Sequence, residues 1–301
     1  MRTKRPIAIV MGITDDWAFA AATVLVALQR YRIAHDYDLI IYHHNLRPRN
    51  QRLLNEIHPC SFRDYDITLL NPERFSRLSR LTFSRYECFA LLQTYSKVLW
   101  LDSDILIKSD ISNLFSIDQS GIAMYKHERI PIIVSFSSSV SGFDMTKDCY
   151  NSGLLLVTDK LENPQELKDW CYRKTNEWAT SIMSDQAIIN LMLQEFDLTV
   201  SHLDITFNCH PDKESCHTVI LHPWGNRKFW DGRIHPLWDY YYLQWTALGG
   251  DGPIIRWDPL RRLIIFRMLY RELTLRCKCY QKLANINAHF RTLLSRLITP
   301  K

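Results

Sequence analysis

Short apolar runs alternate with longer helical segments in the first half of the chain, and this alternation constrains the fold more than any other feature. The runs predicted as buried strands cover residues 7–11, 38–42, 65–70 and 98–101, and the predicted helices cover 17–31, 49–57 and 84–95. This pattern predicts an α/β fold with a mixed, mostly parallel sheet and helices on both faces. Ligands bind such sheets at the carboxyl ends of strands, where Asp15 and Asp102 are found.

The second half of the chain has a less regular pattern. Further strands are predicted at 153–157 and 218–222, and helices at 165–176 and 185–194. The Ser-rich stretch 130–142 is typical of a mobile loop. The glycines and proline of 249–253 suggest a linker, which divides the chain into a catalytic domain over 1–252 and a basic helical tail over 253–301.

Composition excludes several classes of protein. With 47% hydrophobic and 23% charged residues, the 301-residue chain is typical of a globular protein. The longest apolar stretch, residues 18–28, has eleven residues, whereas a membrane span needs about 20. Asp15 and Asp16 interrupt any signal-peptide pattern, and the eight cysteines form no CxxC pair. We therefore expect reduced thiols and a cytoplasmic location.

The positive charge of the chain is concentrated at its C-terminal end. Residues 253–301 contain eleven Lys or Arg and two acids, so this segment carries +9 and the rest of the chain −4. A localised basic segment indicates an anionic partner and does not favour nucleic acid. Two interpretations remain open: an interfacial helix peripheral on the inner face of an anionic membrane, or a solvated helix packed on the body.

The sharpest local motif is Asp102-Ser103-Asp104 at the end of the fourth predicted strand. Two carboxylates separated by one residue can bind one hard divalent cation such as Mg or Mn. The alternative is a pair of solvated turn residues, with Asp104 as a helix cap. A haloacid-dehalogenase-type phosphatase also has such a motif after an apolar strand, but after its first strand, whereas here it follows the fourth.

Two other segments carry polar residues at strand or helix ends. In the block from His222 to Trp230, His222 can complete a metal site, Gly225 permits close backbone approach to a phosphate, and Lys228 supplies a positive charge. The alternative is a Trp-rich packing loop. Asn151-Ser152 before a strand and Asp185-Gln186 at a helix start can hold sugar hydroxyls. Equally, Asn151 can shape a turn and Ser184 can cap the helix.

The order of these motifs along residues 6–240 resembles the family 8 retaining glycosyltransferases, which include glycogenin and bacterial lipooligosaccharide galactosyltransferases. The resemblance implies a GT-A fold, a UDP-sugar donor, a glycan or glycolipid acceptor, and Mn, with Mg as an alternative. It implies metal ligands at Asp102, Asp104 and His222, and catalytic residues at Gln186 and Asp185. The implied nucleotide-sugar-binding residues are Asp15, Trp17, Arg85, Asp102, Ser103, Asn151, Ser152, Asp185, Gln186, Gly225 and Lys228.

The chain departs from the family pattern at several positions. Glu87 stands where the family usually has Lys, Trp17 and Ala18 where Asn and Tyr often follow, and Phe229 where the family has Pro. We expect a metal-dependent, retaining transfer of glucose or galactose in surface polysaccharide, capsule or lipooligosaccharide synthesis. Same-face attack is favoured because Gln186 is a poor nucleophile, and Asp185 is the alternative nucleophile. The non-enzyme alternative is a sugar-nucleotide-binding protein without turnover, which only Glu87 supports.

Overall fold

A seven-stranded mixed sheet forms the centre of the computed structural model, which describes residues 5–33, 36–70, 79–117, 120–225, 227–231 and 233–252. In spatial order the strands are β3 (Ser61–Asp64), β2 (Tyr37–His44), β1 (Arg5–Thr14), β4 (Tyr95–Leu101), β7 (Asp148–Thr158), β6 (Ile122–Pro131) and β8 (Ser201–His202). β7 is antiparallel to β4 and β6, and the other neighbouring pairs are parallel. The predicted α/β class is confirmed.

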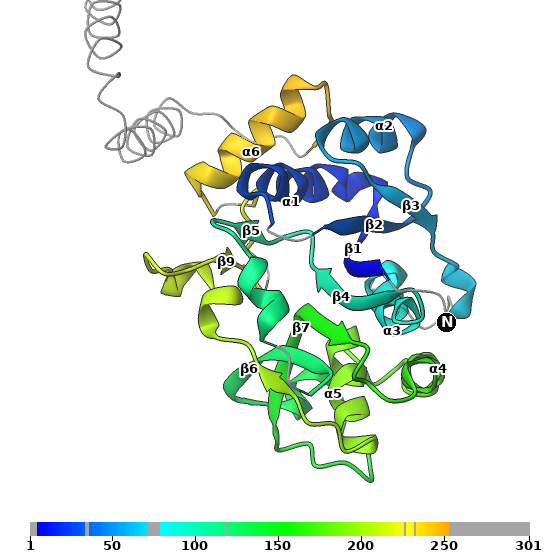
Figure 1. Ribbon diagram of the computed structural model, residues 1–301. Helices are drawn as coiled ribbons and strands as arrows, with labels where there is room; N and C mark the ends of the chain where they lie inside the picture. The colour runs from blue at the N-terminus through cyan, green and yellow to red at the C-terminus, as the bar shows by residue number, and fades with distance from the viewer. Residues whose placement is uncertain are drawn as a thin grey trace, which may run out of the picture.

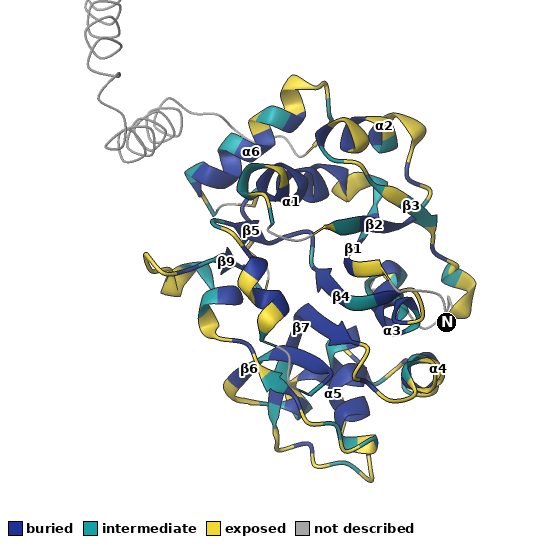
Figure 2. Ribbon diagram, in the orientation of Figure 1, coloured by how far each residue is buried: buried dark blue, intermediate teal, exposed yellow. Residues whose placement is uncertain are grey.

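Helices cover both faces of this sheet (Figure 1). On one face are α1 (Ala18–Tyr31), α2 (Pro48–Ile57) and α6 (Pro236–Ala247), and on the other are α3 (Glu87–Leu91), α4 (Pro164–Glu177) and α5 (Asp185–Glu195). Alternate residues of β1 enter the two apolar cores, with Ile9 in one and Val10 in the other. The central strands are therefore buried on both faces, as Figure 2 shows, which explains their continuous apolar sequences.

A second, two-stranded sheet lies beside the main one. β5 (Leu106–Ile107) pairs antiparallel with β9 (Ile220–Leu221), with Leu106 opposite Leu221. This pairing brings the chain just after β4 next to the chain just after β9. Two segments more than 100 residues apart in the sequence are thereby placed at one edge of the molecule.

The structure corrects two of the expected elements. The strand expected at 65–70 is wrong: β3 ends at Asp64, and Asp66 accepts a hydrogen bond from the Thr68 N–H, which turns the chain into a short 3-10 helix. The helix expected at 84–95 is shorter, because a 3-10 helix at Arg80–Tyr86 leads into α3 and Tyr95 already begins β4. Part of the predicted loop at 130–142 is fastened down, since Phe136 is buried and the Ser137 N–H donates to the Ser181 carbonyl.

Two further findings concern the ends of the described chain. Residues 249–252, expected to begin a linker, are fastened to the body: Arg49 Nη1 lies 2.7 Å from Asp251 Oδ2, and Trp245 Nε1 donates to the Asp251 carbonyl. None of the helices in the described ranges is long and apolar enough to cross a membrane. The basic tail lies outside the described residues.

Candidate active site

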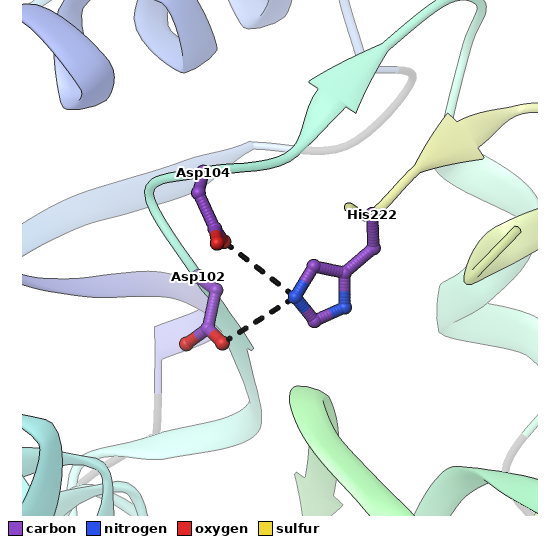
Figure 3. A group of neighbouring side chains, drawn as sticks. All are labelled: Asp102, Asp104 and His222. Carbon is purple, nitrogen blue, oxygen red and sulfur yellow. Dashed lines mark ion pairs between the residues drawn. The ribbon is translucent and has the colours of Figure 1, made fainter. Parts of the chain in front are cut away.

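Three potential metal ligands converge where β4 and β9 end (Figure 3). Asp102 and Asp104 follow β4, and His222 follows β9, which the pairing of β9 with β5 holds beside them. His222 Nε2 lies 3.5 Å from Asp104 Oδ1 and 3.8 Å from Asp102 Oδ2. Two adjacent ligands on one octahedral ion at about 2.1 Å are roughly 3 Å apart, so small movements would let all three bind one cation.

The chemistry of this group fits a divalent cation. Asp104 Oδ1 is buried and has no hydrogen-bond partner among the described residues. A buried carboxylate oxygen without a donor is costly, and a cation at this point would remove that cost. Two carboxylate oxygens and one imidazole nitrogen are ligands suited to Mn or Mg.

Hydrogen bonds behind His222 fix the way its ring faces. Its Nδ1 lies 2.9 Å from Asn208 Oδ1, and Asn208 Nδ2 donates to Asn151 Oδ1 over 2.9 Å. The Gly153 N–H also donates to Asn151 Oδ1, which assigns both amide orientations. Nδ1 of His222 therefore donates to Asn208, and Nε2 faces the carboxylates, where it can bind a cation.

Gly153 makes room for this histidine. A Cβ at Gly153 would lie 2.1 Å from Cε1 of His222 and 2.7 Å from its Nδ1. Its backbone carbonyl also accepts from the Asp102 N–H over 2.9 Å. One glycine thus contacts two of the three potential ligands, and any larger residue would displace the ring.

Arg85 joins the acids of the metal group to those of the neighbouring helix start. Its Nη2 donates to Asp102 Oδ1 over 2.9 Å, and its Nε lies 2.7 Å from Asp185 Oδ2. The arginine side chain is only 4% exposed, and Trp100 Nε1 also donates to Asp102 Oδ1. Arg85 thus orients both carboxylates, and it also lines the cavity beside the metal group, so the donor contact that the resemblance implies for it stays a prediction.

Asp185 and Gln186 at the start of α5 are both held by β7. The oxygens of Asp185 accept hydrogen bonds from Ser152 Oγ and Thr82 Oγ1, and its burial raises the pKa of the carboxyl against the lowering effect of Arg85. Gln186 accepts from the Ser152 N–H over 3.2 Å and donates to Cys149 Sγ over 3.1 Å. Ser184 occupies the N-cap position of α5 as suggested, but its side chain makes no capping hydrogen bond.

Lys228 lies at the metal group as well. Its Nζ is 2.5 Å from Asp104 Oδ2 and donates to the Pro223 carbonyl over 2.8 Å. Gly225, between them in sequence, has a φ of +93°, which a residue with a side chain rarely adopts. Lys228 thus supplies a positive charge beside the acids of the metal group.

A cavity of about 290 Å³ opens beside the metal group. It is lined by Gly12, Ile13, Thr14, Trp17, Ser79, Leu81, Thr82, Arg85, Trp100, Asp102, Ser103 and Asp104. A Cβ at Gly12 would come within 2.5 Å of Ser84 Oγ, so glycine is needed to keep this wall close-packed. Asp15 lies in an adjoining hollow, where it accepts from the Arg47 N–H and Asn50 Nδ2, and Trp17 lines both spaces.

The departures from the family pattern have local explanations. Glu87 does not lie at the metal group: it pairs with Lys168 and accepts a hydrogen bond from the Tyr172 hydroxyl, both on α4. Trp17 packs edge-on against Trp230, with ring centroids 5.2 Å apart. Phe229 is fully buried and stacks on Trp238 of α6. Glu87 and Phe229 therefore serve packing between elements.

Comparison with known proteins decides the family. Residues 8–233, most of the chain, match the family model of glycosyl transferase family 8. The chain belongs to glycosyltransferase family 8. The phosphatase interpretation is therefore wrong, since the motif after β4 occurs within a glycosyltransferase fold.

Two known glycosyltransferases are similar to this chain in sequence. Glycosyltransferase GlyA of Streptococcus pneumoniae is 24% identical over 235 residues, which cover 73% of this chain and 31% of GlyA. The lipopolysaccharide 1,2-glucosyltransferase of Escherichia coli K12 is 27% identical, covering 65% of this chain and 62% of that protein. This family 8 chain thus spans about a third of GlyA.

Two solved structures share the fold of this family 8 protein. The galactosyltransferase LgtC, in complex with donor and acceptor sugar analogues, superimposes with a TM-score of 0.56 at 16% identity, covering 84% of this chain and 97% of LgtC. The bifunctional glycosyltransferase WbbM gives a TM-score of 0.60 at 16% identity, covering 89% and 52% of the two chains. These likenesses show the GT-A fold alone.

Some residues that support the site were not among the predicted site residues. Asn208 and Trp100 touch the metal group through His222 and Asp102, and His127 joins the same hydrogen-bond chain through Asn151. Trp100 and Asn208 lie among apolar residues, which local patterns assign to packing, and His127 lies in the polar run of β6, which matches no recognisable motif. The short spacing from His222 to Trp224 is the one signal that could have drawn attention to Trp224, whose ring contacts His222.

Proposed function

We propose that this chain transfers a hexose, glucose or galactose, from a UDP-sugar to a glycan or glycolipid with retention of anomeric configuration. The observation that carries the proposal is the convergence of Asp102, Asp104 and His222 beside a cavity on the family 8 fold, with one buried carboxylate oxygen that has no hydrogen-bond donor among the described residues. The similarity to the lipopolysaccharide glucosyltransferase supports a role in surface-glycan synthesis. Mn, or Mg, would be held by these three side chains.

The residues around the metal group have distinct proposed roles. The bound cation would supply Lewis-acid stabilisation of the negative charge on the departing diphosphate. Lys228 would neutralise phosphate oxygens as a fixed cation. Asp15 and Trp17, whose hollow adjoins the cavity, would contact the nucleoside, and the backbone at Gly225 would approach the phosphates.

The surroundings of Asp185 favour same-face attack. Its carboxylate is buried against Arg85, Ser152 and Thr82, so it is poorly placed to act as a nucleophile. Gln186 lies next to it and presents an amide, which can stabilise the sugar but is a poor nucleophile. In the proposed mechanism the departing phosphate oxygen takes the proton from the acceptor hydroxyl, while Asp185 and Arg85 keep Asp102 and Ser152 in position.

A screen of UDP-sugars for UDP release, with Mn, Mg or EDTA, tests the proposal. Asp104→Asn should lower turnover by a factor on the order of 10² or more, because the charge that balances the cation is lost. Asp169→Asn is the matched control, since Asp169 lies on the exposed face of α4. Full activity in excess EDTA, or equal activity of the two variants, would contradict the metal-dependent mechanism.

A further inference from the structure

A second, larger cavity lies near the metal group. It measures about 1170 Å³ and is lined by residues of β6 and of the segments on either side of Cys209, namely Tyr125, Lys126, His127, Glu128, Arg129, Ile130, His202, Leu203, Asp204, Ile205, His210, Asp212, Lys213 and Trp224. Trp224 joins the cavity to the metal group, because its ring contacts those of His222 and His127. A saccharide in this cavity would be close to the site of transfer.

A buried hydrogen-bond chain fixes the proton of His127. Asn151 Oδ1 accepts from the Gly153 N–H, so its Nδ2 must face His127 Nε2, which lies 3.1 Å away. Nε2 is therefore an acceptor, and the ring proton sits on Nδ1. Burial and the nearby charges of His222 and Lys213 lower the pKa of His127 to about 4, which keeps the ring neutral. Nδ1–H has no partner among the described residues and is a donor on the cavity wall.

Among the charged residues that line the cavity, most acids have a partner within the protein, whereas two basic side chains have no acidic partner among the described residues. Asp212 pairs with Arg233 at 2.6 Å, and Asp204 accepts from the Thr206 N–H. Lys126 is paired with Asp148, and Glu128 is exposed beside Tyr125. The side chains of Lys213 and Arg129 have no acidic partner among the described residues, although the Arg129 backbone N–H donates to Asp148 Oδ1 over 3.2 Å.

The backbone presents Arg129 in an unusual way. The pairing of β6 with β7 is irregular between Lys126 and Pro131, and within this bulge Arg129 has a φ of +63°. Bulges redirect side chains and often lie beside binding sites, and a positive φ in a residue other than glycine is strained. This strain is consistent with a constraint on the direction of the Arg129 side chain.

We propose that this cavity binds the acceptor saccharide through an anionic substituent, a phosphate or a carboxylate, which the donor groups of His127, Lys213 and Arg129 recognise. Lysine and arginine are donors only, and His127 is fixed as a donor on this side, so the three complement an oxygen-rich anion. Trp224 and Tyr125, stacked at 26° with centroids 6.3 Å apart, offer the sugar an apolar face. This inference rests on the proposed transferase function.

Calorimetric titration of three matched sugars, glucose, glucose 6-phosphate and glucuronate, tests the proposal. The protein is first saturated with UDP and Mn, so that the anionic sugars cannot bind at the diphosphate site. We expect at least one anion to bind about tenfold or more tighter than glucose, as a charge-assisted hydrogen bond would give. A preference for only one of the two anions identifies the substituent. Equal binding of all three sugars overturns the proposal.

Substitutions in the cavity lining test whether the preference for an anionic sugar over glucose arises in this cavity. Lys213→Ala should reduce it about tenfold and Arg129→Ala should lower it in the same direction, whereas Lys147→Ala, an exposed lysine outside the lining, should leave it unchanged. A preference that survives both Lys213→Ala and Arg129→Ala also overturns the proposal. UDP release from a UDP-sugar is measured separately, so a failed transferase function is distinguished from a failed acceptor inference.

Discussion

At the scale of single residues, the candidate metal site depends on Asn208, whose side-chain amide hydrogen-bonds the His222 ring on the side away from the carboxylates. Asn208 is fully buried, and its only described role is to join His222 Nδ1 to Asn151. Without this acceptor the imidazole could rotate or carry its proton on the nitrogen that faces the carboxylates. The ability of His222 to bind a cation is thus set by a residue that touches no cation.

Asn208→Ala should therefore weaken Mn binding by roughly 10- to 100-fold, as loss of a hydrogen-bond partner behind a ligand histidine generally does. Mn binding can be measured by electron paramagnetic resonance at fixed protein concentration. Asn55→Ala, whose side chain accepts from the Cys60 N–H far from the site, is the matched control. Unchanged Mn affinity in a folded Asn208→Ala protein would argue against His222 as a ligand.

At the scale of elements, α6 is part of the core although the family match ends at residue 233. Trp238, Tyr241 and Trp245 of this helix are fully buried, and Trp238 stacks on Tyr242 and Phe229. The helix packs against α1, which carries the chain away from Asp15. Through its packing on α1, α6 thus supports the end of β1, where the nucleoside is expected to bind.

Trp238→Ala should destabilise the protein by about 3–5 kcal/mol, since it removes a fully buried indole. Leu243→Ala on the same helix should change stability by less than about 0.5 kcal/mol, because Leu243 is 41% exposed. Denaturant midpoints of the two variants measure the difference. Similar midpoints for both would show that α6 is not integral to the core.

The elements also show what the sequence can and cannot predict. β1, β2, β4 and β7 were predictable because strands buried on both faces are continuously apolar. β6 was missed because its bulge inserts a polar run, and α6 because aromatic residues surround most of the helix and obscure any polar face.

The candidate site was predictable only in part. The positions of Asp102 and Asp104 follow from a strand end, but the approach of His222 depends on the two-residue pairing of β5 with β9. A pairing of only two residues between distant segments produces no recognisable local pattern in the sequence. The same holds for the chain from His222 to His127, which consists of single residues from four separate segments.

At the scale of the whole molecule, charge is distributed unevenly. Residues 253–301 carry +9 and the preceding residues −4. The candidate metal, phosphate and sugar residues all precede Asp231. We therefore propose that donor binding does not need the basic segment, and that this segment holds the protein at an anionic surface where a glycolipid acceptor is presented.

A chain ending at residue 252 should fold and release UDP from a UDP-sugar, but should lose binding to vesicles of anionic lipid. Sedimentation with vesicles measures binding, and circular dichroism checks folding first. Binding of the full chain should weaken as salt rises, since salt screens the attraction. If the folded short chain loses UDP release while the full chain ignores the vesicles, residues 253–301 belong to the catalytic domain.

The contact between Lys228 and Asp104 has a consequence for the order in which ligands arrive. The Lys228 ammonium group already balances the charge of Asp104, so a cation that enters alone must compete with it. A diphosphate offers the ammonium a new partner and releases the carboxylate at the same moment. Cation and nucleotide should then bind with positive thermodynamic coupling, which is reciprocal by necessity. The protein would therefore favour the pre-formed metal–nucleotide complex over either component, and its apparent affinity for each would depend on the concentration of the other.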